Sequence, residues 1–183
     1  PTGITYSDKQ VTELANLPNK AAAEDFVIFW DNAYAIHDIQ FPGDELASIA
    51  EAAELVGTQD HVVQFASTSK VTFASGGIAF ISSSQLILET LEKQISTFSI
   101  GSDKVNQLRH AQYLLENLDD HMNAHAELLA PKFSLVLKYL EDDLGGLEIA
   151  NWTEPRGGYF ISLDTMMPVA DQVIELAKTA GLV

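Results

Sequence analysis

Two short polar segments each follow an apolar run that is typical of a buried strand. The first run, residues 26–30, is followed directly by Asp31, and Tyr34 comes three positions later. Ligands of open α/β sheets bind outside the carboxyl ends of the strands, so this acid and this phenol would lie at the edge where chemistry takes place. A buried carboxylate there needs a cationic or hydrogen-bonding partner. On position alone, the alternative is that Asp31 only caps the turn after the strand.

The second apolar run, residues 61–66, leads into Ser67, Thr68, Ser69 and Lys70. A lysine amine can form a Schiff base with a carbonyl compound, and the neighbouring hydroxyls can donate hydrogen bonds to a phosphate. A phosphate loop of the nucleotide-binding type is not supported, because no glycines precede the lysine. This second segment therefore offers an amine and three hydroxyls at a neighbouring strand end.

Together the two segments match the polar groups of one molecule, pyridoxal 5′-phosphate. Its aldehyde requires an amine, which Lys70 would supply, and its pyridinium nitrogen requires a carboxylate, which Asp31 would supply. Its ring hydroxyl requires a donor, and Tyr34 is suitably placed. The spacing of the two strand ends therefore predicts a pyridoxal phosphate site.

Two histidine pairs are weaker candidates for chemistry. His121 and His125 lie four apart on an expected helix beside two aspartates, where they could bind a divalent metal. A solvated acidic helix face is the favoured interpretation, and no metal site is predicted. His37 and Asp38 could act as an acid and a base, although a histidine in such a loop more often supports a site indirectly or faces solvent.

The elements that would position these residues follow from the same pattern. Between the two apolar runs, residues 42–44 open a helix to about residue 56, and strand, helix and strand at this spacing form a parallel crossover. Glycines at 76 and 77 precede a third strand at 78–81, and serines 82–84 would cap a helix to about residue 98. These features predict an α/β fold with an open, mostly parallel sheet.

The pattern changes after residue 101. From 102 onward apolar residues recur at threes and fours, which predicts a connecting helix of about seven turns. Pro131 is expected to interrupt it before a second helix to residue 144. A strand pair at 147–153 and 158–163 and a last helix from Pro168 would complete the chain.

Composition excludes several classes of function. Lysine and arginine total 10 against 26 acidic residues among 183, so the net charge of −16 would repel nucleic acids and anionic membranes. The longest uncharged stretch, residues 71–88, is too polar to span a bilayer. The chain has no cysteine, which excludes thiol catalysis and suits a reducing compartment. A cytoplasmic protein that binds neither nucleic acid nor membrane is expected.

Four motifs in order give the sequence a family resemblance. Residues 1–3 resemble the end of an Asn-Pro-Thr-Gly turn and residues 31–34 an Asp-x-Ala-Tyr motif. Residues 67–70 resemble a Ser-x-Ser-Lys motif and residues 156–160 a Pro-x-Gly-Gly-x-Phe hairpin. In this order they resemble the fold type I pyridoxal-phosphate enzymes, specifically the class I and II aminotransferases. The residues around Lys70 are most similar to a divergent bacterial branch of aspartate aminotransferases.

The resemblance implies a role for each motif residue. Lys70 would be the internal aldimine lysine and proton shuttle, Asp31 the partner of the pyridine nitrogen, and Tyr34 a donor to the ring oxygen. Ser67 would donate to the phosphate, and Ser69 is a further phosphate candidate. The family usually has a phosphate-binding arginine eight residues after the lysine, but that position here is Ile78.

The resemblance also implies the organisation of the chain. Residues 1–100 would be the later part of a large cofactor-binding domain, residues 101–130 a connecting helix and residues 131–183 part of a small α+β domain. The chain is expected to be an internal piece of a longer protein. Lys104 and Arg109 lie where some relatives place groups that reach a neighbouring subunit's site, and a homodimer is expected.

The activity implied is amino-group transfer between an amino acid, with aspartate the best candidate, and a 2-oxo acid. Two alternatives remain open at this point. One is a lyase on the same scaffold, because the cofactor supports several reactions and the residues that orient the substrate are not visible. The other is a non-catalytic, aminotransferase-like sensor domain of a transcription regulator.

Overall fold

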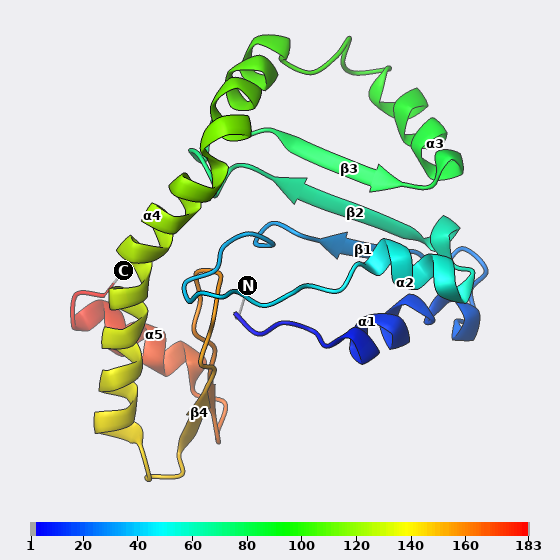
Figure 1. The fold of residues 1–183 in the computed structure, drawn as a ribbon. Coiled ribbons are helices and arrows are strands. Elements are labelled where there is room, and N and C mark those ends of the chain that lie inside the picture. The colour runs from blue at the N-terminus through cyan, green and yellow to red at the C-terminus, as the bar shows by residue number, and fades with distance from the viewer. Residues whose placement is uncertain (1–2, 183) are drawn as a thin grey trace.

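A three-stranded sheet in the order β1, β2, β3 forms the centre of the computed structural model, which describes residues 3–182 (Figure 1). Strands β1 (Ile28–Asp31) and β2 (Val62–Ser67) are parallel, and Asp31 pairs with Phe65. The connection between them contains helix α2 (Ile49–Val56), so the predicted parallel crossover is confirmed. Strand β3 (Ala79–Ser83) is antiparallel to β2, because the chain turns back directly after β2.

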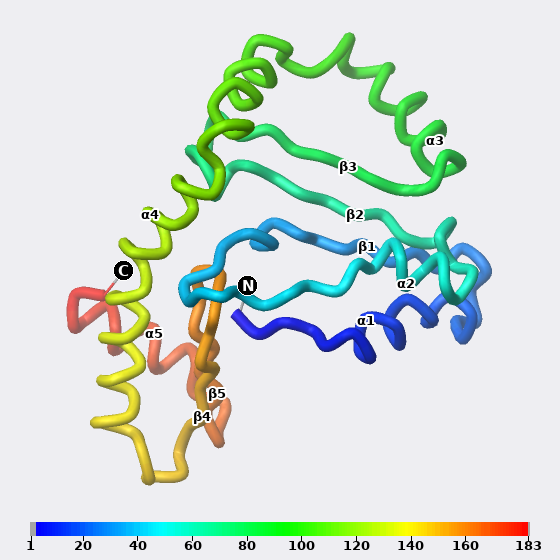
Figure 2. Tube along the Cα trace, viewed as in Figure 1, coloured from blue at the N-terminus to red at the C-terminus, as the bar shows by residue number. Residues whose placement is uncertain are grey.

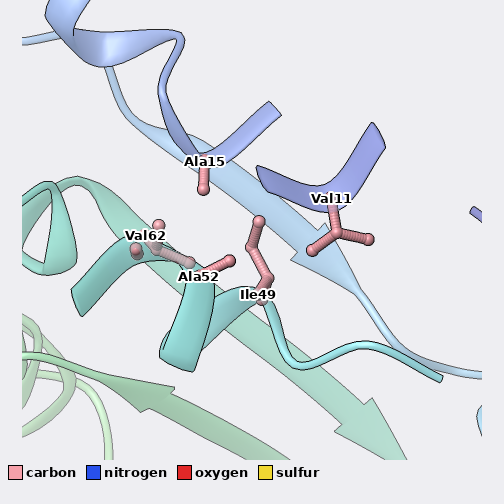
Figure 3. Close-up of a cluster of buried hydrophobic side chains, with 6 residues drawn as sticks. Val11, Ala15, Ile49, Ala52 and Val62 are labelled. Atoms are coloured by element: carbon pink, nitrogen blue, oxygen red, sulfur yellow. The ribbon is translucent and has the colours of Figure 1, made fainter. Parts of the chain in front are cut away.

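Helices α1 (Asp8–Ala15) and α2 pack on one face of this sheet. Figure 3 shows the cluster that they form with Val62 of β2, with Ile49 and Ala15 fully buried. The other face has no such cover among the residues described, and Phe29 of β1 is 73% exposed there. The uninterrupted apolar run at 26–30 had indicated a strand covered on both faces, and only one face is covered here.

The ends of these helices follow from local hydrogen bonds. Ser7 caps α1 in a capping box with Gln10. Helix α2 begins at Ile49 rather than near residue 44, because Ser48 accepts a hydrogen bond from the Glu51 backbone and is the true cap. Gly57 ends α2 in the left-handed conformation, with a φ of 73°.

Helix α4 (Lys104–Leu144) is continuous over 41 residues, so the predicted interruption at Pro131 is wrong. Proline removes one backbone donor, which leaves the carbonyl of Glu127 without its usual partner in the helix. Glu127 is exposed, so water can replace that donor and the helix continues. Helix α3 (Gln85–Ile95) precedes α4, and Ser84 occupies its cap position without a side-chain hydrogen bond.

A short antiparallel pair, β4 (Ala150–Trp152) and β5 (Leu163–Thr165), follows α4, and helix α5 (Ala170–Thr179) ends the described chain. Short 3₁₀ turns lie at Pro18–Lys20 and Gln59–His61. Strand β4 is shorter than the one predicted at 147–153. Strand β5 begins only at the last residue of the one predicted at 158–163, because residues 156–158 bond to residues 37–39 instead of to the hairpin. The Ile39 backbone donates to the Arg156 carbonyl at 2.9 Å, and the Gly158 backbone donates to the His37 carbonyl at 2.8 Å.

Figure 2 shows that α4 extends from the neighbourhood of β3 to that of the β4–β5 pair. The helix therefore connects the sheet with the C-terminal elements, and it crosses the expected boundary at residue 130. The division into residues 1–100, 101–130 and 131–183 stays a prediction. Within residues 3–182, no helix is both long enough and apolar enough to cross a bilayer.

Candidate active site

The predicted site residues follow the ends of two parallel strands. Asp31 is the last residue of β1 and Ser67 is the last residue of β2. Because β1 and β2 are parallel neighbours, their carboxyl ends lie at one edge of the sheet. Tyr34 follows the first strand, and Lys70 follows the second.

Lys70 and Tyr34 are brought together across this edge. The Lys70 Nζ lies 5.5 Å from the centroid of the Tyr34 ring, which is within the range of a cation–π contact. Lys70 is exposed, so its amine is accessible to a ligand. The structure therefore places the amine against the phenol of the other motif.

Asp31 makes the turn-capping contact that the alternative interpretation expected, and its role toward a cofactor stays a prediction. Its Oδ1 accepts a hydrogen bond from the Ala33 backbone at 3.0 Å, so the carboxylate caps the turn as the alternative proposed. The residue is exposed, and Asp31, Tyr34, His37 and Arg156 line an open pocket of about 940 Å³. Lys70 and the two serines lie outside the lining of this pocket.

Ser67 and Ser69 form a small hydroxyl pair before the lysine. The Ser67 hydroxyl donates to Ser69 Oγ at 2.9 Å and accepts from the Ser69 backbone at 3.1 Å. A Cβ at Gly77 would lie only 2.7 Å from the Ser69 backbone, so this turn requires glycine at position 77. Both hydroxyls are half-buried, at the strand end that leads to Lys70.

The position where the family has its phosphate-binding arginine has a structural role here. The Ile78 backbone donates to Thr68 Oγ1 at 2.9 Å, and the Ile78 carbonyl accepts from the Thr68 backbone at 2.9 Å. These bonds close the loop that contains Lys70. Ile78 cannot supply positive charge, so this chain lacks the phosphate-binding arginine that the family pattern has at this position.

Helix α4 holds this loop through three histidines. His110 Nε2 lies 3.0 Å from the Thr72 hydroxyl, and its Nδ1 donates to the Asn106 carbonyl at 2.9 Å. His121 Nε2 donates to the Val71 carbonyl at 2.6 Å. His125 Nε2 is 2.6 Å from the Tyr159 hydroxyl, which itself donates to the Lys70 carbonyl at 3.2 Å.

These contacts correct the interpretation of the helix as a solvated acidic face. His121 and His125 contact the lysine loop directly and through Tyr159, and no cluster of three metal-ligating side chains occurs between residues 3 and 182. Sequence reasoning gave no role to His110 or Tyr159. His110 and His121 are separated by about three helical turns, and His121 and His125 by about one. This spacing is the sequence signal that places the three histidines on one face of the helix.

His37 lies at the centre of an aromatic cluster beside the site. Its ring is 5.6 Å from the Tyr34 ring, 5.9 Å from the His125 ring and 5.6 Å from the Tyr159 ring. The residue is 2% exposed, and neither ring nitrogen has a hydrogen-bond partner among the described residues. His37 is therefore buried, and it makes no hydrogen bond to Asp38.

Burial changes the pKa values of this cluster. Desolvation lowers the pKa of His37, with the backbone of Lys70 and Tyr34 acting in the opposite direction. Burial also lowers the pKa of His125, with the neighbouring charges of His37 and His121 adding to it. Burial and the nearby Tyr34 raise the pKa of Tyr159. Burial therefore favours the neutral form of both histidines and the phenol form of Tyr159.

All four sequence motifs converge on this region. The Gly3 carbonyl accepts a hydrogen bond from the Arg156 backbone at 3.3 Å, and Gly3 has a φ of 74° with Pro155 packed where a Cβ would lie. Pro1 and Thr2, the rest of that motif, lie outside the described residues. The Arg156 guanidinium forms an ion pair with Asp44 at 2.9 Å. Segments separated by up to about 150 residues thus meet around Tyr34 and Lys70.

A parallel strand pair that ends in an aspartate and a serine–lysine turn, next to an antiparallel strand and a long connecting helix, defines part of the pyridoxal-phosphate-dependent transferase fold. The comparisons with known proteins agree with this assignment. A family model described as aspartate amino-transferase matches residues 1–183. The chain belongs to this family, as the motif resemblance predicted.

The relatives also show how much of such a protein the chain represents. It is 40% identical to an aspartate aminotransferase of Corynebacterium glutamicum over 100% of its own length and 42% of that protein. The crystal structure of an aspartate transaminase from the same organism superimposes with a TM-score of 0.91 and 39% identity, covering 100% of this chain and 43% of the other. The chain therefore spans less than half the length of these relatives.

A more distant neighbour shows that the fold is shared by another reaction class. A C-S lyase from Staphylococcus hominis with bound pyridoxal phosphate superimposes with a TM-score of 0.75 at 19% identity, covering 100% of this chain and 45% of the other. At this identity the similarity concerns the fold alone. Fold therefore does not separate transamination from lyase chemistry.

Proposed function

We propose that the longer protein containing this chain is a pyridoxal-phosphate-dependent aminotransferase that moves the amino group of aspartate to a 2-oxo acid such as 2-oxoglutarate. The observation that carries the proposal is the meeting of Lys70 and Tyr34 at the end of two parallel strands, one of which ends in Asp31. The family membership and the 40% identity to an aspartate aminotransferase support the substrate class.

The donor set of the chain fits one side of this cofactor. Lys70 offers an exposed amine, Asp31 an exposed carboxylate, and Ser67 and Ser69 a pair of hydroxyls at the start of the lysine turn. The phosphate is only partly provided for, because Ile78 replaces the arginine and no basic residue lies between Lys70 and Lys93. Further positive charge or backbone donors would come from parts of the longer protein.

Each residue would contribute a defined step. When bound, pyridoxal phosphate supplies an electron sink for the charge that develops at the substrate α-carbon. Lys70 would hold the cofactor covalently, exchange places with the incoming amine and then carry the α-proton as a general base and acid. Asp31 would keep its negative charge and hold a proton on the ring nitrogen, while the Tyr34 hydroxyl would donate to the ring oxygen.

One assay separates this proposal from its two alternatives. The purified longer protein is incubated with pyridoxal phosphate, aspartate and 2-oxoglutarate, and oxaloacetate and glutamate are measured. A parallel incubation with L-cystathionine, which can undergo β-elimination, is assayed for ammonia and pyruvate. Equal amounts of oxaloacetate and glutamate support transamination. Ammonia and pyruvate from L-cystathionine, without glutamate from the first mixture, would indicate a lyase. Cofactor binding with no turnover in either mixture would indicate a sensor domain.

We also propose that the longer protein is a cytoplasmic homodimer, as the resemblance implies. The exposed apolar residues Phe29, Phe80 and Leu108 leave surface that further chain or a second subunit would cover. Light scattering of the active protein should give twice the monomer mass. A monomer mass at assay concentration would contradict the dimer.

A further inference from the structure

Tyr159 makes a contact that the expected chemistry does not use. Its hydroxyl donates to the Lys70 backbone carbonyl at 3.2 Å, across 89 positions of the sequence. The segment between β4 and β5 that carries Tyr159 thus contacts the loop that carries the amine. This bond fixes the main chain of the residue whose side chain would move during the reaction.

The hydroxyl of Tyr159 is itself held in one orientation. A phenol has one proton, so when Tyr159 donates to Lys70 it accepts from His125, whose Nε2 lies 2.6 Å away. His125 must therefore carry its proton on Nε2. Its Nδ1 is buried without a hydrogen-bond partner among the described residues, as expected for the bare nitrogen of a neutral ring.

The same cluster also lies behind the Lys70 amine. The Tyr159 ring is 5.8 Å from the Tyr34 ring, and the Lys70 Nζ lies over that ring at 5.5 Å. Buried His37 fills the space against both tyrosines, with ring separations of 5.6 Å to each. Tyr159 therefore contacts Lys70 at its carbonyl and supports the surface that its amine faces.

We propose that Tyr159 and His125 are positioning residues for Lys70, with His125 directing the Tyr159 hydroxyl to the lysine carbonyl. The inference rests on the proposed function, in which Lys70 carries the proton. Neither residue needs to touch the substrate. Their loss should therefore slow proton transfer by Lys70 and leave substrate binding nearly unchanged.

The test uses the longer protein with Tyr159→Phe, which keeps the ring and removes the hydroxyl. We expect kcat to fall about fivefold to tenfold, the usual effect of one hydrogen bond, with KM for the amino acid changed less than about twofold. In the cofactor-free protein, amide hydrogen exchange of residues 68–73 should rise by a similar factor, while that of α2 stays unchanged. Tyr139→Phe is the matched control, because Tyr139 lies 57% exposed on α4, beside Lys138.

A second pair of variants tests the direction of the relay. His125→Gln keeps an N–H donor toward Tyr159 and should retain most of kcat, whereas His125→Leu should lose as much as Tyr159→Phe. An unchanged kcat in Tyr159→Phe, a fall confined to KM, or equal losses in the two His125 variants would overturn the proposal. Faster exchange throughout the protein would also overturn it, because it would show a general loss of stability.

Failure of the proposed function would look different. The unmodified longer protein would then show no amino-group transfer, and the exchange experiment without cofactor would still report whether Tyr159 holds the lysine loop. If the unmodified protein transfers no amino group and Tyr159→Phe still exchanges faster at 68–73, the bond from Tyr159 to the Lys70 carbonyl is only structural. That result would also overturn the positioning role. The two failures are therefore distinguishable.

Discussion

Lys70 is the residue on which the proposed reaction depends. Replacing it with alanine in the longer protein should abolish the covalent attachment of the cofactor that borohydride reduction makes permanent. Amino-group transfer should fall at least about 10³-fold, because the proton carrier is lost. Mass spectrometry of the borohydride-reduced protein and a transfer assay check both outcomes, with Lys93→Ala on α3 as the control. A pyridoxyl group that stays attached to Lys70→Ala would show that another amine holds the cofactor.

His37 should make the protein less stable in mild acid. Its pKa in the folded protein lies below the ordinary histidine value of 6.5, so the unfolded chain binds the proton first as pH falls. The contribution of neutral His37 is therefore fully present above about pH 6.5 and is lost as pH falls toward the folded pKa. The pKa of His125 is also lowered, so His125 likewise makes the folded protein less stable as pH falls. Burial raises the pKa of Asp38, so Asp38 makes the folded protein more stable as pH falls.

The measurement compares the thermal midpoint of the longer protein at about pH 7.5 and about pH 5.5. His37→Phe keeps a ring among Tyr34 and Tyr159 but cannot take up a proton, so its midpoint should fall by a few degrees less than that of the unmodified protein. An equal fall in both proteins would indicate that His37 is not the titrating group. The other titratable groups near the ring are unchanged in this comparison: Tyr34, Asp38, Lys70, His125 and Tyr159.

The site residues at the strand ends could be predicted from the sequence, but the residues that contact and support the lysine loop could not. Asp31 and Lys70 each follow an apolar run, so their position at a sheet edge could be predicted. Tyr159 and His110 contact residues far away in the chain. The helical spacing of the histidines places them on one face of α4, but no local pattern shows what that face contacts. For His121 the acidic neighbours suggested a solvated surface, although its ring bonds to the Val71 carbonyl.

At the scale of elements, Ile49 at the start of α2 stabilises the packing of α1 and α2 on the sheet. Its side chain is fully buried beside Val11 and Val62. Ile49→Ala should reduce the free energy of unfolding by about 2–5 kcal/mol, because it leaves a cavity in this cluster. Urea unfolding followed by circular dichroism measures the loss.

The same helix provides the control for this prediction. Leu55 is 84% exposed on α2, so Leu55→Ala should change stability by less than about 0.5 kcal/mol. Similar losses for Ile49→Ala and Leu55→Ala would mean that the exposed side of α2 is covered in the longer protein. A loss at neither position would contradict the core described here.

Most elements could be predicted from periodicity, but several of their ends could not. The parallel crossover of β1, α2 and β2 was predicted because apolar runs and a helix alternate at the right spacing. The start of α2 was misplaced because residues 42–44 do not open the helix, and Asp44 pairs with Arg156 from a distant segment. The break at Pro131 was wrong because a long exposed helix tolerates one missing backbone bond.

At the scale of the whole molecule, a polypeptide limited to residues 1–183 should be catalytically silent. It holds only one side of the cofactor, and its net charge of −16 opposes phosphate binding without the arginine that Ile78 replaces. The assay is aspartate to 2-oxoglutarate transfer with excess pyridoxal phosphate, compared with free cofactor and with the longer protein. Transfer clearly above the free-cofactor rate would mean that these residues contain a sufficient site.

The face of α4 that carries His110, His121 and His125 restricts where residues can be inserted or deleted in this protein during evolution. One residue inserted between His110 and His121 would turn the following part of the helix by about 100° and advance it about 1.5 Å. His121 and His125 would then leave Val71 and Tyr159, while His110 kept Thr72. Insertions and deletions should therefore be tolerated in the loop between α3 and α4 and be selected against within this helical segment, even though many of its side chains face solvent.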